Sequence, residues 1–165
     1  MTFSPSFVVK TAGILLACAA LCQCGPKPKP AGDAGAPAVT FHYDVALSFT
    51  PAAAAKLKTM GQKAEVSGYY FGAPNDAGKE KVNEAGDIEL GENLIDVDAA
   101  DQTVPIVANI DAKALAAVEG GQPSVLVSAW LAPTAGVANV LKCTTFKGTG
   151  AEAGTKPVDI HCDLK

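Results

Sequence analysis

Apolar and polar side chains alternate without interruption along residues 39–50. Successive side chains of a β-strand point to opposite faces, so this period of two predicts a strand with one buried and one solvent-facing side. The apolar set occupies the odd positions and consists of Val39, Phe41, Tyr43, Val45, Leu47 and Phe49. The even positions hold Thr40, His42, Asp44, Ala46, Ser48 and Thr50. No other segment of the chain predicts its secondary structure as clearly.

Further strand-like segments follow, and turn residues such as glycine, proline and asparagine separate them. They are 64–72, 86–91, 94–98, 103–110, 124–131, 137–146 and 157–164, while 73–78 and 148–154 have the composition of turns or loops. Seven or eight short strands with regular turns predict an all-β fold, a β-sandwich of the immunoglobulin-like or transthyretin-like kind. A parallel α/β fold is disfavoured because the helical segments are few and small.

Two short helices are predicted in connections between strands. The first covers 51–60, with Thr50 as its N-cap, a proline at its first position and Gly61 at its end. The second runs from the capping residue Asp111 to Gly120. Neither is amphipathic enough to build a helical domain.

Length and charge restrict the class of protein. The chain has 165 residues, which suits one domain, and 13 basic against 17 acidic residues give a formal net charge of -4 at pH 7. All of the basic residues are lysines, so the chain lacks the guanidinium groups that grip phosphate and stack on bases. We therefore expect no nucleic-acid partner and no polybasic membrane-binding surface.

The N-terminus has the features of a secretory signal peptide. Lys10 precedes a short apolar stretch at 11–21 that ends among small residues. This stretch is well below the roughly 20 residues that a membrane-spanning helix needs. The segment Gly25–Pro37 is rich in proline and glycine, which predicts an extended tether that does not pack.

The end of the apolar stretch, Leu15-Leu16-Ala17-Cys18, resembles the lipobox of bacterial lipoproteins. The resemblance implies cleavage before Cys18, lipidation of this cysteine and attachment of the mature chain to a membrane through the lipid. Ala19, at the second mature position, carries no aspartate-type signal for retention in the inner membrane. The resemblance therefore implies an outer-membrane protein that faces the periplasm.

These features divide the chain into a signal peptide at 1–17, an anchor cysteine and tether at 18–38 and a β-sandwich domain at 39–165. The alternative is ordinary signal cleavage near residues 17–20. That cleavage would release a soluble periplasmic or secreted protein without a lipid anchor.

Two of the five cysteines, Cys143 and Cys162, lie in the predicted domain. In the oxidising cell envelope such a pair is expected to form a disulfide. Cys162 shares its strand face with apolar residues and is predicted to point inward. The alternative is a pair of free, buried thiols.

The two histidines are the only imidazoles in the chain. His42 shares a strand face with Asp44, and His161 lies between two aspartates on another. If the first and last strands paired, these residues could converge on copper or zinc. The fixed ligand spacings of known metal sites are absent, so we expect an ordinary solvent-facing strand surface and no cofactor, with the metal site as the alternative.

No catalytic motif is present. The sequence lacks both the glycine-flanked serine of the α/β-hydrolases and a phosphate-binding glycine loop. We therefore expect a protein that is not an enzyme. A hydrolase whose site carries no recognised motif remains an alternative.

Three aromatic residues are candidates for a partner surface. In the segment 64–72, Tyr69 and Phe71 lie on the strand face opposite the one that carries the valine. In the segment 124–131, Trp130 likewise lies opposite the valine-bearing face. If the valine-bearing faces form the core, these aromatics point outward and could bind an envelope protein, a peptide or a glycan. The alternative is that the helix at 51–60 covers them.

The sequence thus predicts a lipid-anchored envelope β-sandwich that acts as a non-catalytic binding, accessory or structural module. One alternative is a periplasmic sandwich protein that binds copper or zinc. The other alternative is the hydrolase without a recognised motif.

Overall fold

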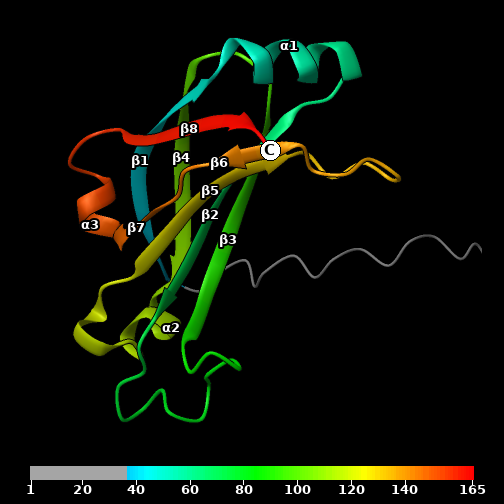
Figure 1. The fold of residues 1–165 in the computed structure, drawn as a ribbon. Coiled ribbons are helices and arrows are strands. Elements are labelled where there is room, and N and C mark those ends of the chain that lie inside the picture. Colours follow the sequence, from blue (N-terminus) through cyan, green and yellow to red (C-terminus); the bar gives the residue numbers. More distant parts are fainter. Residues whose placement is uncertain (1–36) are drawn as a thin grey trace, which may run out of the picture. The chain divides into compact units, whose positions relative to one another are not determined.

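The computed structural model describes residues 37–165, which form an all-β sandwich of two four-stranded sheets (Figure 1). The strands are β1 (Ala38–Phe49), β2 (Ala64–Gly72), β3 (Ile88–Val97), β4 (Gln102–Asp111), β5 (Ser124–Leu131), β6 (Leu141–Cys143), β7 (Phe146–Thr149) and β8 (Val158–Leu164). The helices are α1 (Pro51–Met60), α2 (Ala112–Ala116), α3 (Gly150–Ala153) and the 3-10 turn η1 (Glu119–Gly121). The predicted fold class is therefore confirmed.

Sheet A has the strand order β4-β1-β8-β6, and sheet B has the order β3-β2-β5-β7. All but one of the strand pairs are antiparallel; the exception is β1 with β8, which run parallel. This parallel pairing extends from Val45 opposite Val158 to Phe49 opposite Cys162. The first and last strands of the domain are therefore neighbours in the middle of sheet A.

The core lies between the sheets and is built from the alternating apolar residues that the sequence predicted. Val45 and Leu47 of β1, Val66 of β2 and Val127 of β5 are all buried. The apolar side chains of β1 are buried from Tyr43 onward, whereas the side chain of Val39 is 37% exposed. The N-terminal part of β1 therefore extends beyond the covered core.

The helices lie in the connections between strands and do not form a layer of their own. Thr50 caps α1 by accepting a hydrogen bond from the Ala53 N–H, and Gly61 ends it with a φ of 62°. Ala53 and Leu57 are buried in the core, so α1 closes one end of the sandwich (Figure 1). Both predicted helices are present, although α2 ends at Ala116.

A third helix, α3, occupies part of the segment 148–154, which was predicted as a loop. Thr149 and Glu152 form a reciprocal capping box at its start: the Thr149 hydroxyl accepts from the Glu152 N–H, and the Glu152 carboxylate accepts from the Thr149 N–H. The glycines around this motif favoured the loop prediction. The threonine and glutamate three residues apart are the helix signal that this prediction overlooked.

Two predicted strand boundaries were wrong. The segments 86–91 and 94–98 form the single strand β3, because Gly91, with a φ of 128°, accommodates a register shift and lets the strand continue. The segment 137–146 contributes to both β6 and β7, which belong to different sheets. Alternation within a segment does not reveal where the chain crosses between layers.

The predicted signal peptide, the candidate anchor Cys18 and most of the tether lie outside the described residues. Within residues 37–165, no helix has the length and apolar character needed to cross a membrane.

Candidate functional site

The three aromatic candidates lie on the outer face of sheet B, opposite the core. On β2, Val66 and Tyr70 are buried between the sheets, whereas Tyr69 and Phe71 alternate with them and face outward. Trp130 is half-buried on the same face of β5, where it lies directly opposite Glu65 of β2. The orientation that the sequence suggested for these side chains is therefore the observed one.

Tyr69 and Phe71 form a stacked pair, with ring centroids 5.6 Å apart and an interplanar angle of 21°. The Lys147 ammonium lies 5.3 Å from the centroid of the Phe71 ring, in cation–π geometry. A hollow of about 180 Å³ adjoins these rings, and its lining includes Asn83 and Leu126. Tyr69 is half-buried in this arrangement, and Phe71 keeps 9% of its exposure.

The helix α1 does not cover the stacked pair. It packs against β1 and β8 and lies at the opposite end of the sandwich from α2 and the end of β2 (Figure 1). The residues beside Tyr69 and Phe71 come instead from β7 and from the segment between β2 and β3. The alternative prediction, that the helix at 51–60 covers these aromatics, is wrong for the pair.

Hydrogen bonds order the remainder of this face. The Trp130 indole N–H donates to Glu65 Oε1 at 2.8 Å, and the Ser67 hydroxyl donates to Glu92 Oε1 at 2.8 Å. Trp130 is thereby held against the sheet by a charge-assisted bond. We call the outer-facing residues of β2, β3 and β5 the aromatic face: Glu65, Ser67, Tyr69, Phe71, Glu89, Glu92, Leu94, Asp96, Leu126, Ser128 and Trp130.

The aromatic face carries an excess of negative charge. Burial raises the pKa of Tyr69, and the nearby carboxylates of Glu89, Asp87 and Glu92 raise it further because the phenolate would be another negative charge. The weak hydrogen bond from Asn83 acts in the opposite direction on this pKa. The potential around Tyr69 is therefore negative.

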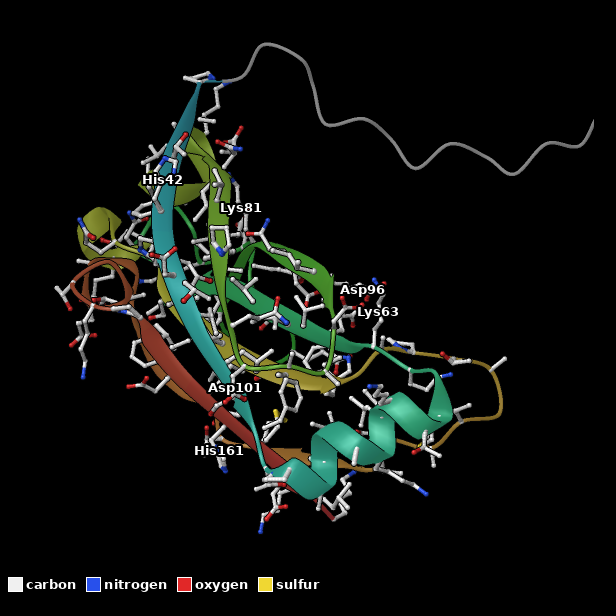
Figure 2. The ribbon with its side chains drawn as sticks, turned by 90° about the horizontal axis from the view of Figure 1, so that it is seen from above. His42, Lys63, Lys81, Asp96, Asp101 and His161 are labelled. Atoms are coloured by element: carbon white, nitrogen blue, oxygen red, sulfur yellow. A yellow bond between two sulfur atoms is a disulfide. The ribbon has the colours of Figure 1, made fainter. Side chains whose placement is uncertain are left out.

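The convergence of His42, Asp44 and His161 that an alternative metal site would need does not occur. β1 and β8 do pair, but their register places Ser48 opposite His161, and His42 lies six residues earlier on β1. At about 3.3 Å per residue, that spacing separates the two histidines by roughly 20 Å along the strand. Figure 2 shows them far apart.

Among residues 37–165, no three histidine, cysteine, aspartate or glutamate side chains gather closely enough to hold a metal ion. His42 and Asp44 instead line an open hollow of about 340 Å³ on sheet A, together with Val107 and Lys156. This set offers two of the usual metal-ligand types, beside an ammonium group that opposes a cation. The geometry of the described residues therefore gives no support to the alternative of a copper or zinc site.

Sequence reasoning missed one polar pair on sheet A. The Ser48 hydroxyl lies 2.9 Å from His161 Nδ1, and neighbouring β1 and β8 hold the two side chains side by side. Asp163 is on the same face, but it accepts a hydrogen bond from Thr50, which is the main cause of its lowered pKa. Serine and imidazole come together because of the pairing register between β1 and β8. Local sequence patterns do not predict that register.

The predicted disulfide between Cys143 and Cys162 is confirmed. The two residues are directly opposite on the antiparallel strands β6 and β8. Cys162 is fully buried, as its strand face predicted, and Cys143 is half-buried. The bond ties the short edge strand β6 to the middle of sheet A.

Comparison with known proteins adds no identification: no protein-family model, curated protein or solved structure matches this chain. Its function must therefore be inferred from its own residues. The aromatic face combines large apolar side chains, a hollow and fixed charges in the described domain, and it is the candidate binding site.

Proposed function

We propose that this chain is a non-catalytic binding module of the cell envelope and that it contacts its partner through the aromatic face. The observation that carries the proposal is the stacked pair of Tyr69 and Phe71 beside a hollow, on a sheet face that α1 leaves uncovered. Aromatic residues are enriched in interfaces, and within this pair it is Tyr69 that offers contact area, because Phe71 keeps only 9% of its exposure. The exposed Leu94 adds further apolar area to this face.

The location in the envelope is part of the proposal and rests on the N-terminal sequence. A lipid on Cys18 would attach the domain to the outer membrane on its periplasmic side, with residues 18–38 as the tether. The Cys143–Cys162 disulfide supports an oxidising compartment. Cleavage without lipidation, which would leave a soluble periplasmic or secreted domain, is the competing outcome.

Mass spectrometry of the mature N-terminus tests the anchor. A diacylglyceryl group on Cys18 is the expected result. An unmodified alanine at the first position would show that the chain is released by ordinary signal cleavage.

Site-specific photo-cross-linking in the native envelope tests the binding role. A photoreactive residue at Leu126, on the aromatic face, is expected to give a discrete adduct, and Tyr69→Ala should reduce its yield. The matched control places the same residue at Asp159, which is exposed on the outer face of sheet A. Absence of an adduct from Leu126, or equal adducts from both positions, would contradict a partner at this face.

The Ser48–His161 pair favours a second candidate function, a serine hydrolase. A serine hydroxyl hydrogen-bonded to an imidazole is the starting arrangement for an activated nucleophile. The third member of such a site is not in place, because Asp163 binds Thr50. Labelling by a fluorophosphonate probe that is lost in Ser48→Ala would support this candidate, and absence of labelling in the wild-type chain would remove it.

A further inference from the structure

We propose that the partner of the aromatic face is a polypeptide segment that carries lysine or arginine side chains next to apolar ones. This inference rests on the proposed binding function and specifies its chemistry. It follows from the charges, the apolar groups and the hydrogen bonds that the face presents together.

The charge on the aromatic face is strongly one-sided. It carries the four carboxylates Glu65, Glu89, Glu92 and Asp96, and the adjacent cations are Lys147 of β7 and Lys63, which directly precedes β2. Within residues 37–165, the ion pairs are Lys63–Asp98 and Lys79–Asp76, so no carboxylate of the face forms a direct ion pair with a lysine of the domain. A cationic partner would complement this charge, whereas an anionic one would be repelled.

The carboxylates retain capacity to accept hydrogen bonds. Glu65 and Glu92 each use one oxygen, for Trp130 and Ser67 respectively. Glu89 and Asp96 accept no side-chain hydrogen bond from residues 37–165 and are exposed. An ammonium or guanidinium group therefore finds available acceptors along the whole of β3.

The apolar groups lie between these charges. Leu94, which is 53% exposed, lies between Glu92 and Asp96 on the same face of β3. Across the sheet, Leu126 is directly opposite Tyr69. Burying these side chains requires apolar groups on the partner, so a purely charged chain would leave them exposed to water.

The aromatic pair already lies beside one cation of the domain. Lys147 shows that the ring of Phe71 already accepts an ammonium group at cation–π distance. Burial is the main cause of the raised pKa of Tyr69, and the neighbouring Glu89 carboxylate raises it further. Neutral glycans can stack on aromatic rings, but they would leave the four carboxylates without compensation.

Titration of the full chain with two matched peptides tests the proposal. The probe is an acetylated and amidated pentapeptide of alternating lysine and leucine, and its counterpart has glutamate in place of lysine. Binding is located by NMR amide shifts and measured by the emission of Trp130, the single tryptophan of the chain. The lysine peptide should shift amides of β2, β3 and β5, and its affinity should fall by about tenfold or more between low and high salt.

Charge-reversal variants test whether the carboxylates of the aromatic face determine which peptide binds. Glu89→Lys combined with Glu92→Lys should abolish binding of the lysine peptide and create binding of the glutamate peptide. The matched control, Asp159→Lys on sheet A, changes charge by the same sign at another exposed carboxylate and should leave the lysine peptide bound. Because Glu92 accepts from Ser67, the single variant Glu89→Lys provides the same comparison without loss of that hydrogen bond.

Three results would overturn the inference: equal binding of both peptides, no binding of the lysine peptide, or binding only of a neutral oligosaccharide at the same amides. The photo-cross-link at Leu126 separates this failure from that of the proposed function. If the cross-linked adduct forms but the lysine peptide does not bind, the chemistry assigned to the partner is wrong and the binding role stands. If the adduct does not form, the binding role itself is wrong.

Discussion

Tyr43 of sheet A and Tyr70 of sheet B join the two layers through a hydrogen bond of 2.9 Å between their phenolic oxygens. Tyr70 donates its own proton to Asn93 Oδ1 at 3.0 Å, so Tyr43 is the donor to Tyr70. Both side chains are buried, with 6% and 2% of their exposure remaining. A Cβ at Gly68 would collide with the Tyr43 hydroxyl, so glycine at that position leaves room for the pair.

Removal of the hydroxyls one at a time should have unequal effects. Tyr70→Phe leaves the Tyr43 hydroxyl buried without an acceptor and should lower the free energy of unfolding by about 1–3 kcal/mol. Tyr43→Phe preserves the bond from Tyr70 to Asn93 and should cost only about 0.5–1.5 kcal/mol. Urea denaturation of the full chain measures both values.

The double variant Tyr43→Phe with Tyr70→Phe completes the thermodynamic cycle. Its cost should fall below the sum of the two single costs, since no unpaired hydroxyl donor remains from the pair. Strict additivity would show that the two hydroxyls do not interact.

Ionisation of the same pair should oppose folding at high pH. Burial raises the pKa of both Tyr43 and Tyr70 above the ordinary value of 10.0. A group whose folded pKa is raised contributes stability below its unfolded pKa and loses it as pH rises toward the folded pKa. Stability should therefore decline above pH 10, and less steeply in the double phenylalanine variant.

The near-ultraviolet absorbance of tyrosinate provides the measurement. Tyr69, which is half-buried at the surface, should ionise before Tyr43 and Tyr70. The absorbance of the two buried residues should rise together with the loss of folded structure. Ionisation of all three tyrosines in the folded chain near pH 10 would contradict the buried arrangement.

The disulfide should be a major contributor to stability. Joining Cys143 to Cys162 closes a loop with a sequence separation of 19, which corresponds to roughly 3 kcal/mol in the chain-entropy account. Reduction should lower the denaturation midpoint of the wild-type chain accordingly. The variant with serine at both positions should start at the lower midpoint and show no response to a reductant.

Acid should weaken the start of α3. Hydrogen bonds from the Thr149 backbone and hydroxyl lower the pKa of Glu152 below its ordinary 4.5. A group with a lowered folded pKa contributes stability above its unfolded pKa, and this contribution is lost as pH falls through the folded value. Glu152→Gln should therefore be less stable than wild type at neutral pH and equal to it in strong acid.

Thermal denaturation at a series of pH values compares the two chains. Glutamine can still occupy the capping box, so the comparison isolates the charge of Glu152. A constant difference between the chains across all pH values would contradict the proposed linkage.

The first strand and the helix α1 were predictable because their determinants are local. Alternation from Tyr43 to Phe49 follows directly from burial on one face, and Thr50 and Gly61 mark the ends of α1 without reference to any other element. The pairing partner of each strand could not be predicted in the same way, because it depends on residues far away in the chain. The division of 137–146 between two sheets illustrates this limit.

In the candidate site, too, the locally determined features were predictable and those that depend on strand pairing were not. Alternation along β2 correctly placed Tyr69 and Phe71 on the outer face, since each position depends only on its neighbours. The alternative of a metal site required a particular register between β1 and β8, and the observed register places His161 opposite Ser48 instead of His42. The contact between Lys147 and Phe71 also depends on strand pairing, in this case of β7 with β5. No local sequence pattern predicts that pairing.

The position of β1 between β4 and β8 also has a consequence for biosynthesis. The contact between Ser48 and His161 joins residues 113 positions apart, and β1 must wait for its second neighbour, β8, until more than a hundred further residues have been synthesised. Loop closure over such distances slows folding. Sheet A therefore stays incomplete until β8 has been synthesised, and β1 can pair only with β4 before that point.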